Sequence, residues 1–443
     1  MTDETGDRRP LTPTELRDHR WWVERFGVDD PRRSPVQDVD PKNLASTGWG
    51  VVFAPDASPE VREALRPLLD HRWGQAGPYF KEYTYSPGMT KQDFLAQQKA
   101  PPGPADPRHV PYYLLIVGDP RTIPFRFQYE MDVQYGVGRI CFESAEEYAN
   151  YARSVVRAET EPPARPRKLT FFATAHDGDR ATDRTSHDLV LPLAESLAAE
   201  DLAWDIRLVA GPQATKAGLG SLLGGAETPA LLFTATHGMS FPPDHPRLFS
   251  DLGALLCQEW PGPESWREPI PPDFWFSAAD VQEDADLQGL VAFHFASYGG
   301  GTPAVESMDD DSLGTPKQLA PYPFIARLPQ RLLSHPRGGA LAVVSLIGQG
   351  SQSSINWTES SQIQIFESFF QRLLQGHPVG SAMEYFNQRY AELSVDLSSL
   401  WVDRESGLAV SPSRFSRIWR AMHDMRSYVV LGDPAVRLAC REG

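Results

Sequence analysis

Two stretches of the sequence decide the fold: residues 230–238 read ALLFTATHG, and residues 289–301 read GLVAFHFASYGGG. Each is a short apolar run that ends in small or turn-forming residues, as expected of a strand buried in a parallel sheet. The first run ends in His237 and Gly238, and the second ends in Ser297 before a run of glycines. Because reactive groups of open α/β sheets lie at the carboxyl ends of strands, these residues are the first candidates for a site.

The same kind of pattern continues on both sides of these two runs. Further strand-like runs occupy 48–55, 112–120, 168–175, 205–210, 338–348 and 427–438. Apolar residues recur at helical spacing in 58–72, 144–159, 186–199, 361–375 and 380–394. Strands that alternate with helices predict an α/β fold with a mostly parallel sheet flanked by helices.

The length of 443 residues favours two or three folding units. Residues 1–47 form a polar N-terminal arm with Trp21, Trp22 and Phe26 as its aromatic residues. A proline-rich, basic segment, TEPPARPRK, begins at Thr160 and indicates a boundary near residue 165. We therefore predict two lobes: a small α/β subdomain over 48–165 and a larger domain over 166–443.

Composition limits the possible partners. A formal net charge of -16 and a pI near 5.2 exclude an extended nucleic-acid surface, which needs clustered Lys and Arg. No apolar run is long enough to span a membrane and no secretory leader is visible, so we expect a cytoplasmic protein. The three cysteines form no CxxC pair and no HExxH motif occurs, so no cofactor is expected. A peptide or protein is the expected partner.

The two strand ends together resemble the caspase-like cysteine peptidases of clan CD, which place His-Gly at one strand end and Ala-Cys at the next. Segments 111–140 and 427–438 resemble the gingipain-type branch of that clan, in which a smaller α/β subdomain precedes the caspase-like one. The resemblance implies an endopeptidase with His237 as general acid/base, residue 297 as nucleophile and the Gly238 amide as an oxyanion donor. It also allows for an activating protein partner.

The sequence departs from this family at the nucleophile, because Ser297 stands where the family has Cys. Three interpretations are open: an inactivating replacement of the Cys, a natural pseudo-peptidase that binds a peptide or protein without cleavage, or a working serine nucleophile. A hydroxyl needs a better positioned base than a thiol does. His294 is a rival base, but strand alternation places it on the opposite face from Ser297, so we expect it to be buried structure.

In this clan the loop after the first core strand often reads the side chain that precedes the scissile bond. Here that segment, 176–188, is acidic, and Asp183 with Asp188 predicts cleavage after Arg or Lys. The alternative is that these aspartates are solvated loop and helix-cap residues. The resemblance also implies an aromatic wall for the pocket, for which Trp357 is the candidate.

The acidic run Ser307–Ser312 could bind calcium, which gingipain-type enzymes bind. It lacks the EF-hand pattern, so a solvated acidic loop is the better explanation of this run.

Overall fold

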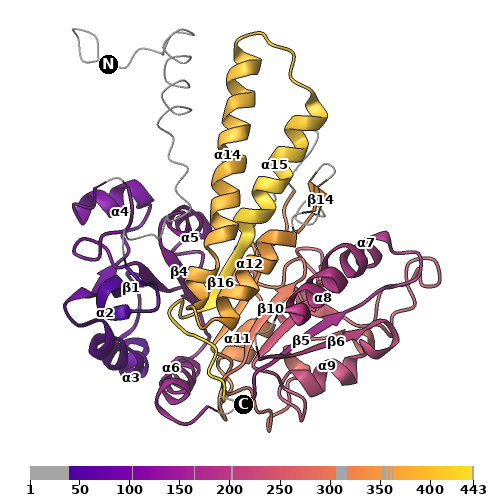
Figure 1. Cartoon of the computed structure of the whole chain (residues 1–443), viewed down its shortest axis with the longest axis horizontal. Coiled ribbons are helices and arrows are strands. Elements are labelled where there is room, and N and C mark those ends of the chain that lie inside the picture. Colours follow the sequence, from indigo (N-terminus) through magenta and orange to yellow (C-terminus); the bar gives the residue numbers. More distant parts are fainter. Residues whose placement is uncertain are drawn as a thin grey trace.

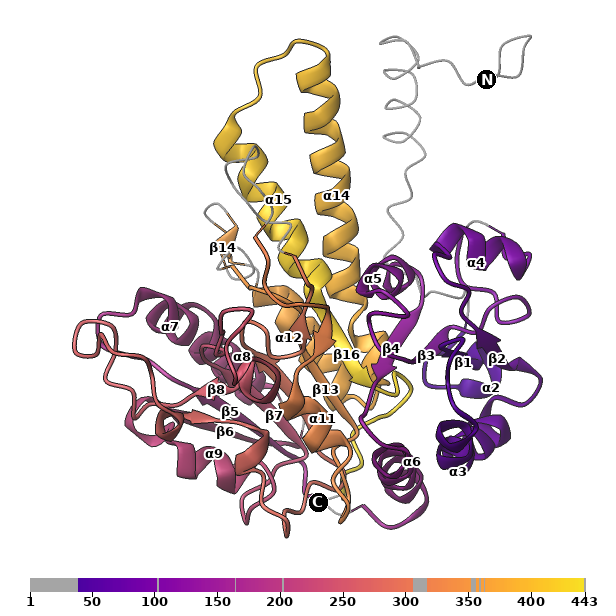
Figure 2. The ribbon, with the colours of Figure 1, turned by 180° about the vertical axis from the view of Figure 1, so that it is seen from behind.

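The computed structural model describes residues 39–441 except 102, 164, 201–202, 306–316, 352–355, 358–359 and 362. Ten strands form one sheet in the order β2-β1-β3-β4-β16-β13-β10-β7-β5-β6, with helices on its faces (Figures 1 and 2). The first four strands pair in parallel, and so do β5, β6, β7, β10 and β13. The predicted α/β class with a mostly parallel sheet is confirmed.

The N-terminal half of the described chain builds one end of the sheet. Its strands are β1 (Trp49–Phe53), β2 (Phe80–Thr84), β3 (Tyr113–Val117) and β4 (Gly136–Ile140). Its helices are α2 (Leu44–Thr47), α3 (Pro59–Ala76), η1 (Gly77–Tyr79), α4 (Lys91–Gln97), α5 (Phe125–Asp132) and α6 (Ala145–Thr160). Hydroxyl side chains cap several of these helices. At the start of α6 the Ser144 hydroxyl accepts from the Glu147 backbone N–H, and the Ser144 backbone N–H donates to the Glu147 carboxylate.

The C-terminal half builds the other end. Its long strands are β5 (Lys168–Ala173), β6 (Asp205–Ala210), β7 (Leu231–Ala235), β10 (Val291–Phe295), β13 (Ala342–Leu346) and β16 (Tyr428–Gly432). Short pairs join β8 (Leu255–Leu256) to β9 (Trp275–Phe276), β11 (Gly301–Thr302) to β12 (Phe324–Ile325), and β14 (Asn356–Trp357) to β15 (Ser360–Ser361). Its helices are α7 (Arg180–Arg184), η2 (Thr185–Val190), α8 (Leu191–Ala199), η3 (Gly211–Gln213), α9 (Lys216–Leu222), α10 (Leu248–Asp251), η4 (Pro272–Phe274), η5 (Ala278–Asp280), α11 (Arg327–Leu333), α12 (Ile363–Leu374), α13 (Val379–Ala382), α14 (Glu384–Glu405) and α15 (Pro412–Ser427).

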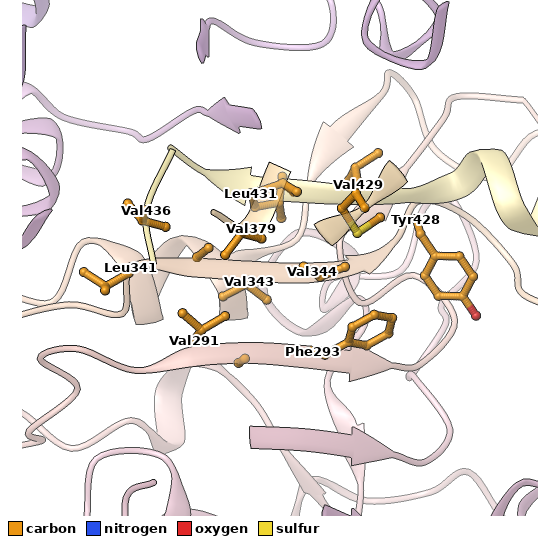
Figure 3. Close-up of a cluster of buried hydrophobic side chains, with 14 of the residues drawn as sticks. Val291, Phe293, Leu341, Val343, Val344, Val379, Tyr428, Val429, Leu431 and Val436 are labelled. Atoms are coloured by element: carbon orange, nitrogen blue, oxygen red, sulfur yellow. The ribbon is translucent and has the colours of Figure 1, made fainter. Parts of the chain in front are cut away.

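The central strands are apolar because both of their faces are covered. Every residue of β7 and β13 is buried, and in β10 only Phe295 retains partial exposure. Figure 3 shows Val291, Phe293, Val343 and Tyr428 packed between neighbouring strands. On one face, Phe293 meets the aromatic rings of α12 and α14, with its ring centroid 5.3 Å from that of Phe369. This aromatic layer fixes the central strands from which the candidate site residues extend.

β16 joins the two halves into one continuous sheet. It lies between β4 and β13, and its pairing with β13 is antiparallel, with Tyr428 opposite Leu346 and Gly432 opposite Ala342. The chain therefore enters β16 beside the carboxyl end of β13 and leaves it beside the amino end. The predicted boundary at residue 165 and the two lobes remain predictions, because the sheet runs without a break from β2 to β6.

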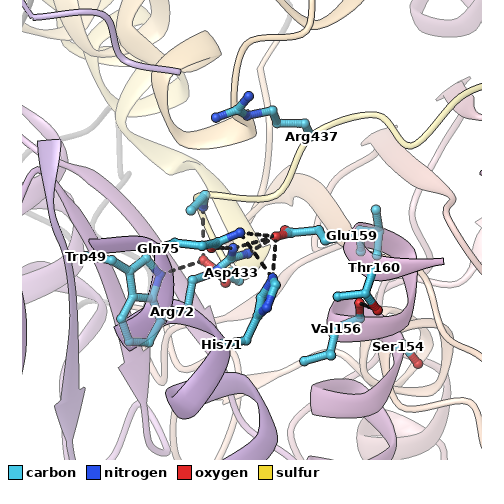
Figure 4. A network of polar contacts seen from close by, with 12 residues as sticks. Trp49, His71, Arg72, Gln75, Ser154, Val156, Glu159, Thr160, Asp433 and Arg437 are labelled. Carbon is cyan, nitrogen blue, oxygen red and sulfur yellow. Dashed lines mark hydrogen bonds and ion pairs between the residues drawn. The ribbon is translucent and has the colours of Figure 1, made fainter. Parts of the chain in front are cut away.

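A cluster of buried charged residues lies at the end of β16, where the two halves of the sheet meet (Figure 4). The Arg72 guanidinium donates from Nε to Asp433 Oδ2 at 2.7 Å and from a terminal nitrogen to Glu159 Oε1 at 2.7 Å. Trp49 Nε1 donates to Asp433 Oδ1 at 2.9 Å. Burial alone would raise the pKa of Glu159, but the Arg72 charge and hydrogen bonds from His71 and Arg72 hold that pKa well below its ordinary value. The cluster ties α3, α6 and β1 to the end of β16.

The C-terminal helices differ from the sequence-based prediction. The helix expected over 380–394 is the short α13 followed by α14, which continues to Glu405, and the sequence had not predicted α15. The two long helices pack together as a hairpin that projects from the sheet (Figures 1 and 2). Their shared contacts, such as Trp401 against Phe415, supply the apolar partners that neither helix has alone. Trp21, Trp22 and Phe26 of the predicted arm lie outside the described residues.

Replacing Arg72 by Met should lower the free energy of unfolding by about 3–5 kcal/mol, because it leaves the Asp433 carboxylate buried without a cation. Urea unfolding followed by circular dichroism measures this change. Arg66→Met on the same helix is the matched control, since Arg66 pairs with Glu63 at the surface and should leave the midpoint unchanged. Equal midpoints for the two variants would contradict a stabilising role for the cluster.

Candidate functional site

His237 and Ser297 lie side by side because their strands are neighbours in register. β7 and β10 pair in parallel, with Ala235 opposite Phe295. His237 and Ser297 each follow two residues later, so both leave the sheet at the same level of its carboxyl edge. Both are partly exposed, and both line one cavity of about 90 Å³.

The backbone directly after His237 lies so close to the Ser297 backbone that only glycine fits at position 238. A Cβ built on Gly238 would lie 1.8 Å from the Ser297 carbonyl oxygen. The backbone N–H groups of Gly238 and Ser297 make no hydrogen bond with any described residue. Backbone amides that are not used within the described chain are the kind of donor that can stabilise an oxyanion.

A tight turn presents Ser297 at the end of β10. Tyr298 adopts a left-handed conformation with φ of 61°, which is unusual for a residue with a bulky side chain. Its amide donates to the Gly348 carbonyl at 2.7 Å, and its carbonyl accepts from Gly301 at 3.0 Å. A Cβ on Gly299 would lie 2.5 Å from Ser345 Oγ. These contacts hold the strained turn and explain why glycines follow Ser297.

Asp179 is the partner of the candidate base. His237 Nε2 lies 2.5 Å from Asp179 Oδ2. The carboxylate is fixed from its own side as the N-cap of α7, because it accepts from the Ala181 amide at 3.0 Å and from Thr182 Oγ1 at 2.9 Å. Asp179 is mostly buried, whereas the His237 side chain is 41% exposed and remains open to a ligand.

The Asp179 contact also sets the protonation of the imidazole. Partial burial would raise the pKa of Asp179, but hydrogen bonds from His237, Ala181 and Thr182 together with the His237 charge hold that pKa well below its ordinary value. Since an ionised carboxylate only accepts, Nε2 of His237 carries a proton and donates it to this bond. In the neutral ring Nδ1 is then the nitrogen that can accept a proton, as a general base requires.

A long segment, 239–288, is inserted between β7 and β10 and contacts the loop that carries Asp179. Gln258 bonds the backbone of Ala175 twice, accepting from its amide at 2.8 Å and donating to its carbonyl at 2.6 Å. The His176 ring is buried, with Nδ1 2.9 Å from the Trp260 carbonyl. Burial lowers the pKa of His176, and the nearby His237 lowers it further. The insertion therefore serves as a support for the site.

The cavity beside Ser297 is small and mostly apolar. Its lining comes from the ends of β7 and β10, from the segment 181–185 and from the loop after β13; the residues are Ala181, Thr182, Thr185, Thr236, His237, Phe295, Ala296, Ser297, Leu346, Gly350 and Ser351. The Gly350 amide donates to Ser297 Oγ at 3.1 Å. Side chains from four separate parts of the chain thus surround the candidate nucleophile.

The structure does not bring the predicted specificity carboxylates into this cavity. Asp183 and Asp188 are both exposed, and Asp183 lies 3.2 Å from His187, one helical turn away. Thr182 and Thr185 of the same segment line the cavity in their place. The backbone of Trp357 belongs to β14, but its side chain lies outside the described residues.

His294 is buried, as predicted. Its side chain has no exposed surface, its Nδ1 lies 2.8 Å from Thr234 Oγ1, and burial lowers its pKa to about 4. It packs on the face of the sheet opposite Phe293 and is not a base for Ser297.

The calcium prediction on Ser307–Ser312 lies outside the described residues. Within the ranges that the structure describes, no group of three or more His, Cys, Asp or Glu side chains is arranged to hold a metal ion. The helices of this same part of the chain are all too short or too polar to cross a lipid bilayer.

Sequence reasoning missed two groups of this site. Asp179 lies within the acidic segment 176–188 that the sequence assigns to a substrate pocket, although its position before Arg180-Ala181-Thr182 is typical of a helix N-cap. That signal locates the carboxylate at a helix start but says nothing about His237. The Gly350 amide carries no sequence signal, because any residue other than proline provides one.

Comparison with known proteins supports the fold. No protein-family model matches the sequence, and no curated protein matches it. A solved structure described as a protease aligns over 89% of this chain and 80% of its own, with a TM-score of 0.50 and 13% identity. The complex of the pro- and mature domains of Porphyromonas gingivalis RgpB aligns over 88% of this chain and 80% of its own, with a TM-score of 0.48 and 12% identity. The chain therefore has a fold like that of a protease.

Gly238→Ala should lower the free energy of unfolding by about 3 kcal/mol or more, because its methyl group would overlap the Ser297 carbonyl. Urea unfolding measures this loss. Gly74→Ala is the control: Gly74 lies in α3 with no atom within 4 Å of an added Cβ, so this change should stabilise the protein by about 0.5–1 kcal/mol. A tolerated alanine at 238 would show that the close approach of the two strand ends is not required.

Proposed function

We propose that this chain carries the site of a caspase-like, gingipain-type endopeptidase, with residue 297 in the position of the nucleophile and His237 as general acid/base. The observation that carries the proposal is the cavity that His237 and Ser297 share, with Asp179 bonded to Nε2 of the imidazole. The likeness to a protease fold supports it independently.

The proposed reaction is acyl transfer in two steps. The atom at the tip of residue 297 attacks the peptide carbonyl carbon and gives its proton to His237 Nδ1. The negative oxygen that forms accepts from the free amides of Gly238 and Ser297. The imidazolium then protonates the leaving amine as the C–N bond breaks, and water hydrolyses the acyl group by the reverse sequence. Asp179 stabilises the charged imidazole throughout.

The side chain of residue 297 decides the rate of this reaction. The thiolate is a far better nucleophile at neutral pH than a hydroxyl, which loses its proton only with the help of a very well placed base. The chain with Ser297 should therefore be nearly inert.

A second candidate function rests on Ser297 itself. The serine removes the thiol of the family and leaves the cavity, the two amides and the Asp179–His237 pair in place. Such a site would bind a peptide or protein without cleaving it. Binding of peptides by the Ser297 protein, together with no turnover after the thiol is restored, would favour this function over the peptidase.

Ser297→Cys should give peptide-bond cleavage, and His237→Ala in that background should lower kcat/KM by about 10²–10⁴. The measurement is hydrolysis of a fluorogenic peptide library, with and without candidate activating proteins. Asp179→Asn should reduce kcat through the orientation of the imidazole, while Asp205→Asn, an exposed aspartate at the start of β6, is the control. No turnover by the thiol variant under any of these conditions would rule out the peptidase.

We further propose that cleavage follows a basic residue of a protein or peptide substrate. The segment that supplies Thr182 and Thr185 to the cavity also carries Asp183 and Asp188. A basic side chain would have to meet these exposed carboxylates at the rim of the cavity, where charge-assisted hydrogen bonds are possible but screened by water. The net charge of -16 adds a weak long-range attraction.

In the Ser297→Cys background, Asp183→Asn or Asp188→Asn should lower kcat/KM for substrates with Arg before the scissile bond by about two- to fivefold, because exposed ion pairs contribute little. Substrates that differ only at that residue give the comparison, and Asp205→Asn again controls for the change in net charge. A preference for apolar or acidic residues, unchanged by both variants, would show that this segment does not read the substrate.

A further inference from the structure

The loop after β13 connects the candidate nucleophile to the C-terminal helical hairpin. On one side of the loop the Gly350 amide donates to Ser297 Oγ at 3.1 Å. On the other side the next residue, Ser351, donates twice to Asp424: its amide to Oδ1 at 3.0 Å and its hydroxyl to Oδ2 at 2.5 Å. Three hydrogen bonds across two consecutive loop residues thus join Asp424 to Ser297.

Asp424 reaches this loop because of the direction of β16. α15 runs into β16 at Ser427, and the antiparallel pairing of β16 with β13 sets Tyr428 opposite Leu346. The last turn of α15 therefore lies at the carboxyl end of β13, which is the edge that carries the candidate site. Figures 1 and 2 show α15 descending onto the sheet at β16.

Two features of the Asp424 position disfavour its negative charge. It is 1% exposed, and a buried carboxylate is unfavourable unless hydrogen bonds compensate for its lost water. It lies in the last turn of its helix, where the helix dipole disfavours a negative charge. The two hydrogen bonds from Ser351 provide such compensation for the buried carboxylate.

We infer that Asp424 is a positioning residue for the nucleophile at 297: by fixing Ser351 it holds the Gly350 amide against the reacting atom. The inference rests on the proposed function only in treating residue 297 as the nucleophile. An N–H that points at this atom stabilises its ionised form relative to its neutral form. Glycine at position 350 lets the backbone come this close to Ser297. A Cβ added there would lie 3.0 Å from the Leu346 side chain and 3.6 Å from Ser297 Oγ.

The test uses the Ser297→Cys variant, whose thiol reports the local electrostatics without any peptide substrate. The rate of alkylation by iodoacetamide between pH 5 and 10, followed by mass spectrometry of the peptide that contains position 297, gives the thiol pKa. The Ser297 protein supplies the background, which should be low because burial raises the pKa of Cys141 and of Cys440 to about 12 and also raises that of Cys257.

Asp424→Ala in this background should raise the pKa of the introduced thiol by about one to two units, since a hydrogen bond to a charged group is lost. Alkylation at pH 7 should slow by about tenfold or more. Asp424→Asn should remain close to the parent, because an amide can accept from the Ser351 N–H and donate to its hydroxyl. Ser427→Ala is the control on α15, because its hydroxyl donates to the His423 carbonyl within the same helix.

Two further measurements keep the outcome decisive. Circular dichroism establishes whether each variant is folded. If Asp424→Ala does not fold, Ser351→Ala takes its place, because it removes one of the two bonds to Asp424 and leaves α15 unchanged. This variant should raise the thiol pKa by a smaller amount. A thiol pKa unchanged to within about 0.2 units in both variants would overturn the inference. A shifted pKa without peptide turnover would retain the inference and reject the peptidase, so the two failures are distinguishable.

Discussion

The pairing of β16 between β4 and β13 is the constraint on which the rest of the structure depends. This one strand completes the sheet, and it is drawn from the end of the chain. Its two ends serve different purposes. At one end Asp433 enters the buried cluster with Arg72, Glu159 and Trp49, and at the other end Tyr428 follows the last turn of α15. A strand that ran the other way could not deliver α15 to the carboxyl edge of β13.

The candidate site is a product of strand register combined with close backbone approach. Strand register places His237 and Ser297 at the same height on the carboxyl edge of the sheet. Gly238 allows the backbone after β7 to contact the backbone at Ser297. The strained turn at Tyr298 then directs the chain away from the sheet. None of these features depends on a flexible side chain, so the positions of His237 and Ser297 are set by the backbone of the central strands.

Two carboxylates support the site from opposite sides. Asp179 bonds the imidazole directly and fixes the nitrogen that carries the proton. Asp424 accepts from Ser351, whose neighbour Gly350 donates its amide to Ser297 Oγ. Both side chains are shielded from water, which strengthens their hydrogen bonds relative to those of exposed carboxylates. Asp183 and Asp188 are exposed and do not line the cavity, so their proposed role concerns substrate choice and not the arrangement of the site.

The sequence by itself determined the fold class, the central strands, the positions of His237 and Ser297 at strand ends and the burial of His294, because strand periodicity and turn residues are local properties. The bonds from Asp179 and Asp424, the extent of the C-terminal hairpin and the continuity of the sheet through β16 were decided only by the tertiary structure. The reason is physical: Asp179 meets a residue 58 positions away and Asp424 one 73 positions away. Whether a carboxylate caps a helix, meets solvent or orients a reacting group depends on which distant backbone packs against it, and no local pattern records that choice.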